Sequence, residues 1–263
     1  MSKPSPAWVP QQHGAWGMLI VPYLAGLILA SRVRPLVWAD LLLGLTWLIG
    51  YFAFNALSLT LKSAPRRRPA YRVPLLTYGA LTGIAGAGVL LTRGWEILWW
   101  SPAYAVLLGW TLWLVAHKKE RSLASGLLTV VASCGLMLVL RWATPQAILG
   151  TADPSTLPHL ATAFAVTGYF AGTVFYVKAL IRERKDPRST TRSIVYHGVF
   201  ALAIVGCWLA GWLSWPWALW AVALAARAAW VPGYAAAHQW RPRHIGVSEI
   251  VVSVITVVIL LLG

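Results

Sequence analysis

Basic side chains gather at the ends of two long apolar runs, and they are the residues of this chain best suited to chemistry. Near the end of the first of these runs, Asn55, Ser58 and Lys62 are spaced by three and four residues, which places them on one helical face. Arg66 and two further arginines follow. Arginine holds phosphate oxygens with a planar fork of donors, and lysine supplies a compact charge. The pattern predicts a site for an anionic head group, although the arginines equally suit a loop that is merely kept in the cytoplasm.

The run at about residues 157–181 ends in a second polar group, with side chains on two different helical faces. One face holds Lys178, Arg182 and Lys185, and the other holds Tyr169, Thr173 and Tyr176. One face is expected to line a cavity and the other to meet lipid head groups or a neighbouring helix. The sequence leaves open which face does which, and lysines near helix ends commonly reach to the membrane surface without binding a ligand.

A third feature is Arg227, which lies inside an alanine-rich apolar segment. A charge within a membrane is costly and usually has a partner or a function. Glu249 is the expected partner if the last two apolar runs pair as a hairpin. A structural ion pair and a ligand site are equally compatible with this pattern.

His13 stands where the polar N-terminus gives way to the first apolar run. A histidine at a helix start can bind a head group, carry a proton or ligate a metal. The six histidines show no ligand spacing, and the seven acidic residues include no pair on one helical face. The sequence therefore predicts no metal site and no cofactor.

Composition fixes the class of protein. The chain has 263 residues, of which 59% are hydrophobic and only 11% charged, whereas soluble domains carry about a quarter charged residues. Apolar runs of roughly 18 residues or more indicate membrane spans. We predict an all-α bundle of about nine transmembrane helices, with residues 1–14 as an arm and residues 15–263 as a single domain. The expected spans are about 15–31, 38–61, 73–92, 97–116, 123–142, 157–181, 194–213, 217–234 and 245–262. In the third span, Gly79 and Gly83 form a G-x-x-x-G pattern that allows close helix approach.

The net charge of +15 follows the connecting loops. If the N-terminus is cytoplasmic, all but four of the 22 Lys and Arg residues fall on the cytoplasmic side, as the positive-inside rule requires. The four exceptions are Arg32, Arg34, Arg93 and Arg141. We therefore expect a cytoplasmic N-terminus and an extracytoplasmic C-terminus. No motif or separate basic domain indicates nucleic-acid binding.

The N-terminal sequence Pro10-Gln11-Gln12-His13-Gly14-Ala15-Trp16, followed by Leu19-Ile20-Val21-Pro22, resembles the YwiC-like family of bacterial membrane proteins. This resemblance implies a multi-pass protein of the bacterial inner membrane, and it implies little about chemistry.

A second resemblance is to the UbiA superfamily of intramembrane prenyltransferases, which have nine helices and active-site loops after the second and sixth. The two polar ends described above fall after the second and sixth expected spans. That superfamily carries Asn-Asp-x-x-Asp in the first region, where this chain has Asn55-Ala56-Leu57-Ser58-Leu59, and Asp186 is the only aspartate of the second region. The carboxylates that would hold Mg²⁺ at a diphosphate are thus missing.

We expect a cytoplasm-facing basic cavity that binds an amphipathic anion such as an isoprenoid or lipid phosphate. A divergent prenyltransferase, which would need Mg²⁺, and a membrane transporter are the alternatives, and whether the protein is an enzyme stays open. The expected binding residues are His13, Asn55, Ser58, Lys62, Arg66, Lys178, Arg182 and Lys185.

Overall fold

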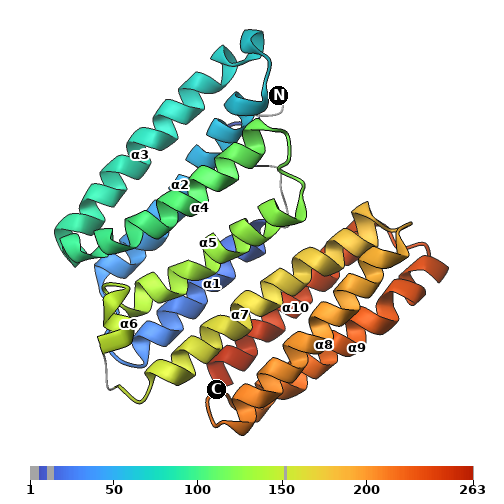
Figure 1. Ribbon diagram of the computed structural model, residues 1–263. Helices are drawn as coiled ribbons and strands as arrows, with labels where there is room; N and C mark the ends of the chain where they lie inside the picture. Colours follow the sequence, from blue (N-terminus) through green and yellow to red (C-terminus); the bar gives the residue numbers. More distant parts are fainter. Residues whose placement is uncertain (1–5, 11–14, 151–152, 263) are drawn as a thin grey trace.

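The computed structural model describes residues 6–10, 15–150 and 153–262, and within those ranges the regular structure is entirely helical. Nine long helices lie side by side in the described chain (Figure 1). They are α1 (Ala15–Ser31), α2 (Trp38–Lys62), α3 (Pro69–Arg93), α4 (Ser101–Ala116), α5 (Leu123–Arg141), α7 (Thr156–Val177), α8 (Pro187–Leu209), α9 (Trp215–Ala237) and α10 (Pro242–Leu262). Four short elements join them: η1 (Pro65–Arg67), η2 (Trp95–Trp100), α6 (Gln146–Gly150) and the π-helical turn η3 (Lys178–Arg182).

Seven helical segments are long and apolar enough to cross a membrane, so the expected all-α membrane bundle is confirmed. The other two of the nine expected spans, α1 and α9, fall short of that standard. Helix α1 has 17 residues, which rise about 25 Å against a hydrocarbon thickness of about 30 Å. Helix α9 has the length, but its tryptophans, prolines and Arg227 make it less apolar. Both pack within the same bundle as the other seven.

Proline sets several helix starts earlier than hydropathy alone predicts. Helices α3, α8 and α10 begin at Pro69, Pro187 and Pro242, several residues before the apolar runs that were expected at 73, 194 and 245. The ring of proline presets the helical φ, and its missing N–H costs nothing in the first turn. The polar residues before each apolar run are therefore helical too. The expected loop at residues 143–157 also contains a helix, the short α6.

The helices form two groups joined through a central pair (Figure 1). Helix α2 packs against α3 and α4, while α7, α8, α9 and α10 make up the other group. Between them, α1 pairs with α5, and α5 also packs on α7. The largest apolar core spans α1, α5 and the α7–α10 group, with Met137 and Ile204 fully buried inside it.

Close helix approach occurs at Gly26 and not at the expected glycines. A Cβ on Gly26 would lie 2.5 Å from Leu140 Cδ1 and 3.0 Å from Met137 Cα, so the α1–α5 contact needs glycine at this position. At Gly79 and Gly83 an added Cβ would meet nothing within 4 Å. The G-x-x-x-G pattern allows close approach, but no described helix packs against it, because Gly79 and Gly83 lie on an exposed face of α3.

Replacing Gly26 with alanine is expected to destabilise the protein by about 1–3 kcal/mol, because the backbone at Met137 cannot move aside as a side chain can. Gly83→Ala is the matched control and should be neutral or slightly stabilising, since alanine favours helix and has open space there. Thermal unfolding of the purified variants in detergent measures both. Equal melting temperatures for the two variants would show that the α1–α5 contact tolerates a methyl group.

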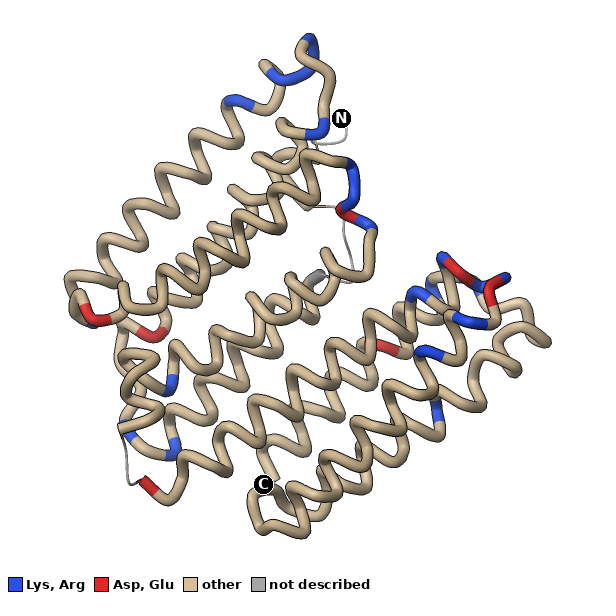
Figure 2. The backbone as a smooth tube through the Cα atoms, viewed as in Figure 1, with Lys and Arg blue, Asp and Glu red and all other residues tan. Residues whose placement is uncertain are grey.

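Most charged residues lie towards the two ends of the bundle, with largely apolar helix between them (Figure 2). We call the end formed by the α2–α3, α4–α5, α7–α8 and α9–α10 loops the basic end, and the other the opposite end. At the opposite end Asp40 is completely buried. Arg34 donates to both of its carboxylate oxygens, at 2.6 and 2.7 Å, and Arg93 donates to one at 3.0 Å.

The same two arginines also reach α5. Arg34 donates to the carbonyl oxygen of Leu140 at 3.0 Å, and Arg93 donates to the same carbonyl at 2.8 Å. Tyr23 of α1 donates to the backbone carbonyl of Asp40 at 3.2 Å. Asp40, its two arginines and Tyr23 thus link α1 with the start of α2 and the ends of α3 and α5.

The other two arginines of this end are also engaged. Arg32 donates to the carbonyl oxygen of Leu260 at 2.7 Å, near the end of α10. Arg141 bonds Asp153 and donates to Nδ1 of His159 at 2.9 Å. All four arginines that break the charge pattern therefore hold helix ends together.

Asp40→Asn should lower the free energy of unfolding by about 3–5 kcal/mol, because it leaves two guanidinium groups without their buried counter-charge. The control is Glu96→Gln, which removes an exposed acid from the same end and should cost less than about 0.5 kcal/mol. The loss of monodisperse protein on heating, followed by size-exclusion chromatography, compares the two. If both variants melt like the wild type, the Asp40 network does not hold these helices together.

Candidate functional site

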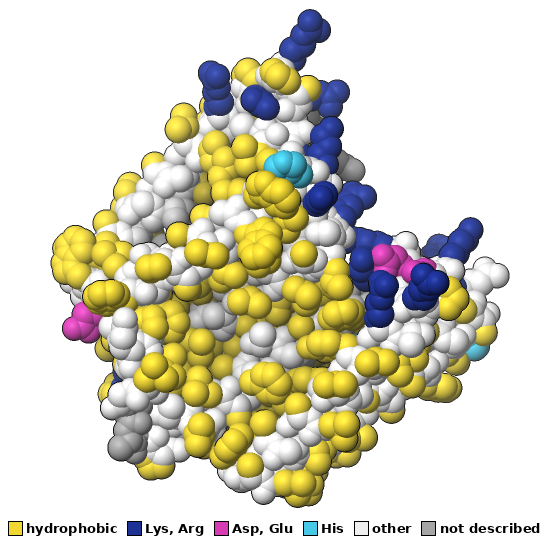
Figure 3. Space-filling model, in the orientation of Figure 1, with side chains coloured by type: hydrophobic (Ala, Val, Ile, Leu, Met, Phe, Trp, Pro, Cys, Tyr) yellow, Lys and Arg dark blue, Asp and Glu magenta, His cyan; other side chains and the backbone are white. Residues whose placement is uncertain are grey.

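The basic ends of α2 and α7 meet on one loop, the segment between α4 and α5. Lys62 Nζ lies 3.7 Å from Glu120 Oε1, and Arg182 Nη1 donates to the carbonyl oxygen of Arg121 at 3.3 Å. In the space-filling view the surface is hollowed beside this region, and basic side chains gather on both sides of the hollow (Figure 3). Two polar ends that are far apart in sequence are therefore neighbours in space.

The remaining predicted residues divide into engaged and exposed ones. Asn55 donates to the carbonyl oxygen of Pro6 at 2.9 Å, so its amide holds the N-terminal arm. Lys178 pairs with Glu183 at 2.8 Å. Ser58 Oγ is buried without a hydrogen-bond partner, while Arg66 and Lys185 are exposed. His13 lies outside the described residues.

The two polar faces of α7 have different surroundings. Tyr169 and Tyr176 are buried, and Thr173 is partly buried, against the neighbouring helices of the α7–α10 group. Lys178 and Arg182 lie in the π-helical turn that follows, and Arg182 is exposed at the basic end. The tyrosine face therefore points into the protein, and Arg182 lies at its surface.

The buried face of α7 meets a charged pair inside the bundle. Arg227 Nη1 of α9 donates to Glu249 Oε1 of α10 at 2.8 Å, so Glu249 is the partner that the sequence suggested. Thr173 donates to the other carboxylate oxygen at 3.0 Å, and the guanidinium carbon lies 4.1 Å from the ring centre of Tyr176. The contact between α9 and α10 thus runs through side chains that α7 helps to hold.

Helix α8 adds a polar face of its own beside this pair. Ser189, Ser193 and His197 are buried at intervals of four residues, and Nδ1 of His197 lies 2.7 Å from the carbonyl oxygen of Ser193. The His197 ring packs edge-on to Tyr176 at 6.3 Å between centroids. An added Cβ on Gly172 would come within 2.8 Å of His197 Nε2, so glycine gives the imidazole its place. These residues were not predicted as a group, although their spacing of four residues places them on one helical face.

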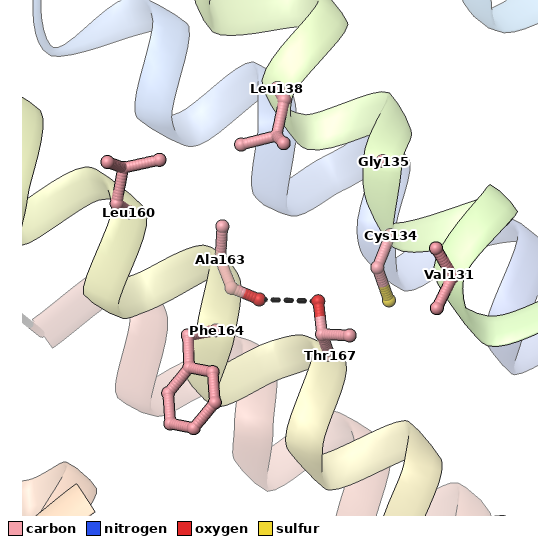
Figure 4. Close-up of a pocket in the computed structure, with 8 residues that line it drawn as sticks. All are labelled: Val131, Cys134, Gly135, Leu138, Leu160, Ala163, Phe164 and Thr167. Atoms are coloured by element: carbon pink, nitrogen blue, oxygen red, sulfur yellow. Dashed lines mark hydrogen bonds between the residues drawn. The ribbon is translucent and has the colours of Figure 1, made fainter. Parts of the chain in front are cut away.

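Two pockets lie away from the predicted binding residues. One, of about 220 Å³, opens between α5 and α7 and is lined by apolar groups such as Leu138 and Phe164 (Figure 4). The Thr167 hydroxyl points back to its own helix, donating to Ala163 O at 2.6 Å. The other, of about 420 Å³, lies at the start of α10 beside Trp240 and His244.

Among the described residues, no three His, Cys, Asp or Glu side chains are grouped so that they could hold a metal ion.

The helices, their apolar surfaces and the charged ends define a multi-pass membrane protein. A family model described as "YwiC-like protein" matches residues 9–141, half of the chain. The protein belongs to the YwiC-like family.

Two bacterial relatives cover most of the chain. The Bacillus subtilis (strain 168) protein named "Uncharacterized protein YwiC" is 29% identical over 209 residues, which are 78% of this chain and 80% of that protein. An "Uncharacterized protein" of Haemophilus influenzae is 27% identical over 201 residues, 75% of this chain and 77% of its own. No solved structure matches. The family model ends at the last residue of α5, so the Arg227–Glu249 pair lies outside the matched region.

The ion pair between Lys178 and Glu183 makes a pH-dependent contribution to stability. Hydrogen bonds from Lys178 and Ser189 hold the pKa of Glu183 below its ordinary value. A carboxylate with a lowered pKa stabilises the fold above its unfolded pKa and loses that contribution as the pH falls through the folded pKa. Ser189→Ala should therefore lower the melting temperature at pH 7 and have a smaller effect once Glu183 is protonated. Thr191→Ala, at an exposed position of the same helix turn, should show no such pH dependence.

Proposed function

We propose that this membrane protein binds an anionic amphipathic molecule, an isoprenoid phosphate or another lipid phosphate, at its basic end. The observation that carries the proposal is the meeting of Lys62 and Arg182 on the adjacent residues Glu120 and Arg121. A phosphate placed there receives charge from two helix ends at once, while its apolar chain lies along the lipid-facing helices.

The charge balance of the basic end supports an anionic ligand. Only three acids stand among its loops, and all three are engaged. Glu120 pairs with Lys62, and Glu183 pairs with Lys178. Asp186 accepts from the backbone N–H of Arg188 at 3.0 Å, at the start of α8. The remaining guanidinium and ammonium groups have no acid at this end to neutralise them, and arginine binds phosphate oxygens in pairs.

Ser58 supplies a neutral hydrogen-bond donor close to the same place. Its hydroxyl lies on α2 one turn before Lys62 and is buried without a partner. A buried polar group left unsatisfied costs about 1–3 kcal/mol, so a ligand oxygen at this position is favoured. Asn55, by contrast, stabilises the arm through Pro6 and has only an indirect role in this proposal.

The proposal includes an orientation. The basic end carries most of the Lys and Arg residues, and the positive-inside rule places it in the cytoplasm of a bacterial cell, with the protein in the inner membrane. The ligand would therefore reach the site from the cytoplasmic leaflet. Binding is favoured over prenyl transfer, because Glu183 and Asp186 are used in contacts within the α7–α8 loop and the start of α8.

The proposal predicts that the double variant Lys62→Gln, Arg182→Gln binds geranylgeranyl monophosphate at least about tenfold more weakly than the wild type, since each charged hydrogen bond contributes about 1.5–3 kcal/mol. Glu120→Gln should bind it more tightly, because Lys62 is released from its partner. Native mass spectrometry of the purified protein measures the bound fraction, with geranylgeraniol as the ligand that lacks the phosphate.

The matched control is Arg241→Gln, Arg243→Gln, which removes the same charge from the start of α10 and the residue before it. Equal losses in the two double variants would reduce the effect to diffuse attraction. Equal binding of the phosphate and the alcohol by the wild type would contradict the phosphate site itself.

A further inference from the structure

We propose that Arg227 holds a second anion-binding site, inside the α7–α10 group, for the carboxylate or phosphate group of a small molecule or lipid. The site is independent of the one at the basic end, because it uses α9 and α10 in place of α2 and the α4–α5 loop.

The free edge of the Arg227 guanidinium carries this inference. Its Nη1 donates to Glu249 Oε1 at 2.8 Å. Its Nε and Nη2 are both buried, and neither has a hydrogen-bond partner among the residues that the structure describes. These two nitrogens lie on one edge of the planar group and point their N–H bonds in the same direction. That edge fits two oxygens of one carboxylate or phosphate, and each buried donor left empty costs about 1–3 kcal/mol.

The surroundings keep this edge in place and keep Glu249 away from it. The ring of Tyr176 lies 4.1 Å from the guanidinium carbon and supports its flat face. Thr173 donates to Glu249 Oε2 at 3.0 Å, while Oε1 is used by Nη1. Both carboxylate oxygens are thus occupied, and the acid neutralises the arginine without filling its second edge.

A polar face on α8 connects this position with the basic end. Ser189, Ser193 and His197 are buried on that face, and Ser193 Oγ is a further buried hydroxyl without a partner. Arg227 lies ten residues before the end of α9, a depth of about 15 Å at the α-helical rise. Polar groups of α8 therefore lie between the basic end and the depth of the guanidinium.

Ligand-dependent thermal unfolding of the purified full-length protein tests the site. Sodium acetate and sodium phosphate are titrated against sodium chloride at constant ionic strength, and phosphatidic acid in mixed micelles is a separate arm. Acetate and phosphate offer paired oxygens and chloride does not, so a saturable rise in melting temperature is expected with the oxyanions. A response to phosphatidic acid alone identifies the occupant as a lipid phosphate, and a response to the free ions identifies a soluble anion.

Two variants separate this site from general effects of salt. In the Lys62→Gln, Arg182→Gln background, which removes the site at the basic end, Arg227→Lys keeps the charge but loses the paired edge, so the difference between oxyanion and chloride should disappear. Glu249→Gln removes the competing carboxylate, so the apparent affinity for the oxyanion should rise about tenfold or more; a structural ion pair alone would only lose stability. Arg243→Lys, at an exposed position in the first turn of α10, should respond like the protein without it.

Three results would overturn the proposal. The first is a wild type that responds equally to chloride and to all oxyanion probes, which would mean that water fills the edge. The second is an oxyanion response of the Lys62→Gln, Arg182→Gln protein, which lacks the site at the basic end, that survives when Arg227→Lys is added. The third is a Glu249→Gln protein with unchanged affinity. If Arg227→Lys fails to fold, the saturation of the wild type and the affinity of Glu249→Gln decide the matter.

Discussion

The buried carboxylate of Asp40 fixes how the two halves of the bundle fit together. A full negative charge without solvent exposure needs paired donors, and it finds them in Arg34 and Arg93 from two different segments. Those arginines also hold the end of α5 through Leu140. Because α5 packs on α7, the arrangement at one end of the bundle positions the helices whose far ends carry the proposed phosphate site.

The two ends of the molecule use the same residue types for different purposes. At the opposite end, four arginines bond carboxylates and helix carbonyls, and these bonds hold helix ends together. At the basic end the cationic side chains outnumber the acidic ones, so net positive charge remains available to an anion from outside the chain. The middle of the bundle combines both conditions, because Arg227 has a counter-ion on one edge and nothing on the other. Arginines whose donors are satisfied by nearby acids and carbonyls have a structural role. Arginines with donors left over are the ones proposed to bind a ligand.

Much of the fold could be predicted from the sequence, because the apolar runs define membrane helices directly. Helix starts were placed late where proline and polar residues precede the apolar run, as at Pro187. The basic ends of α2 and α7 were identified, but their meeting on Glu120 and Arg121 depends on tertiary packing. Asp40 was missed, since its partner Arg93 is 53 residues away. The G-x-x-x-G pattern that includes Gly83 does not locate a helix contact, because small residues permit a neighbouring helix to approach but do not require one.

The π-helical turn at Lys178–Arg182 has an evolutionary consequence. Such a turn holds one more residue than an α-helical turn, so it can gain or lose one residue while the chain after it continues in nearly the same direction. Tyr169, Thr173 and Tyr176 precede the turn and keep their helical face through such a change. The segment that carries the proposed phosphate site can therefore change in length by a single codon, while the charged interior stays under separate selection.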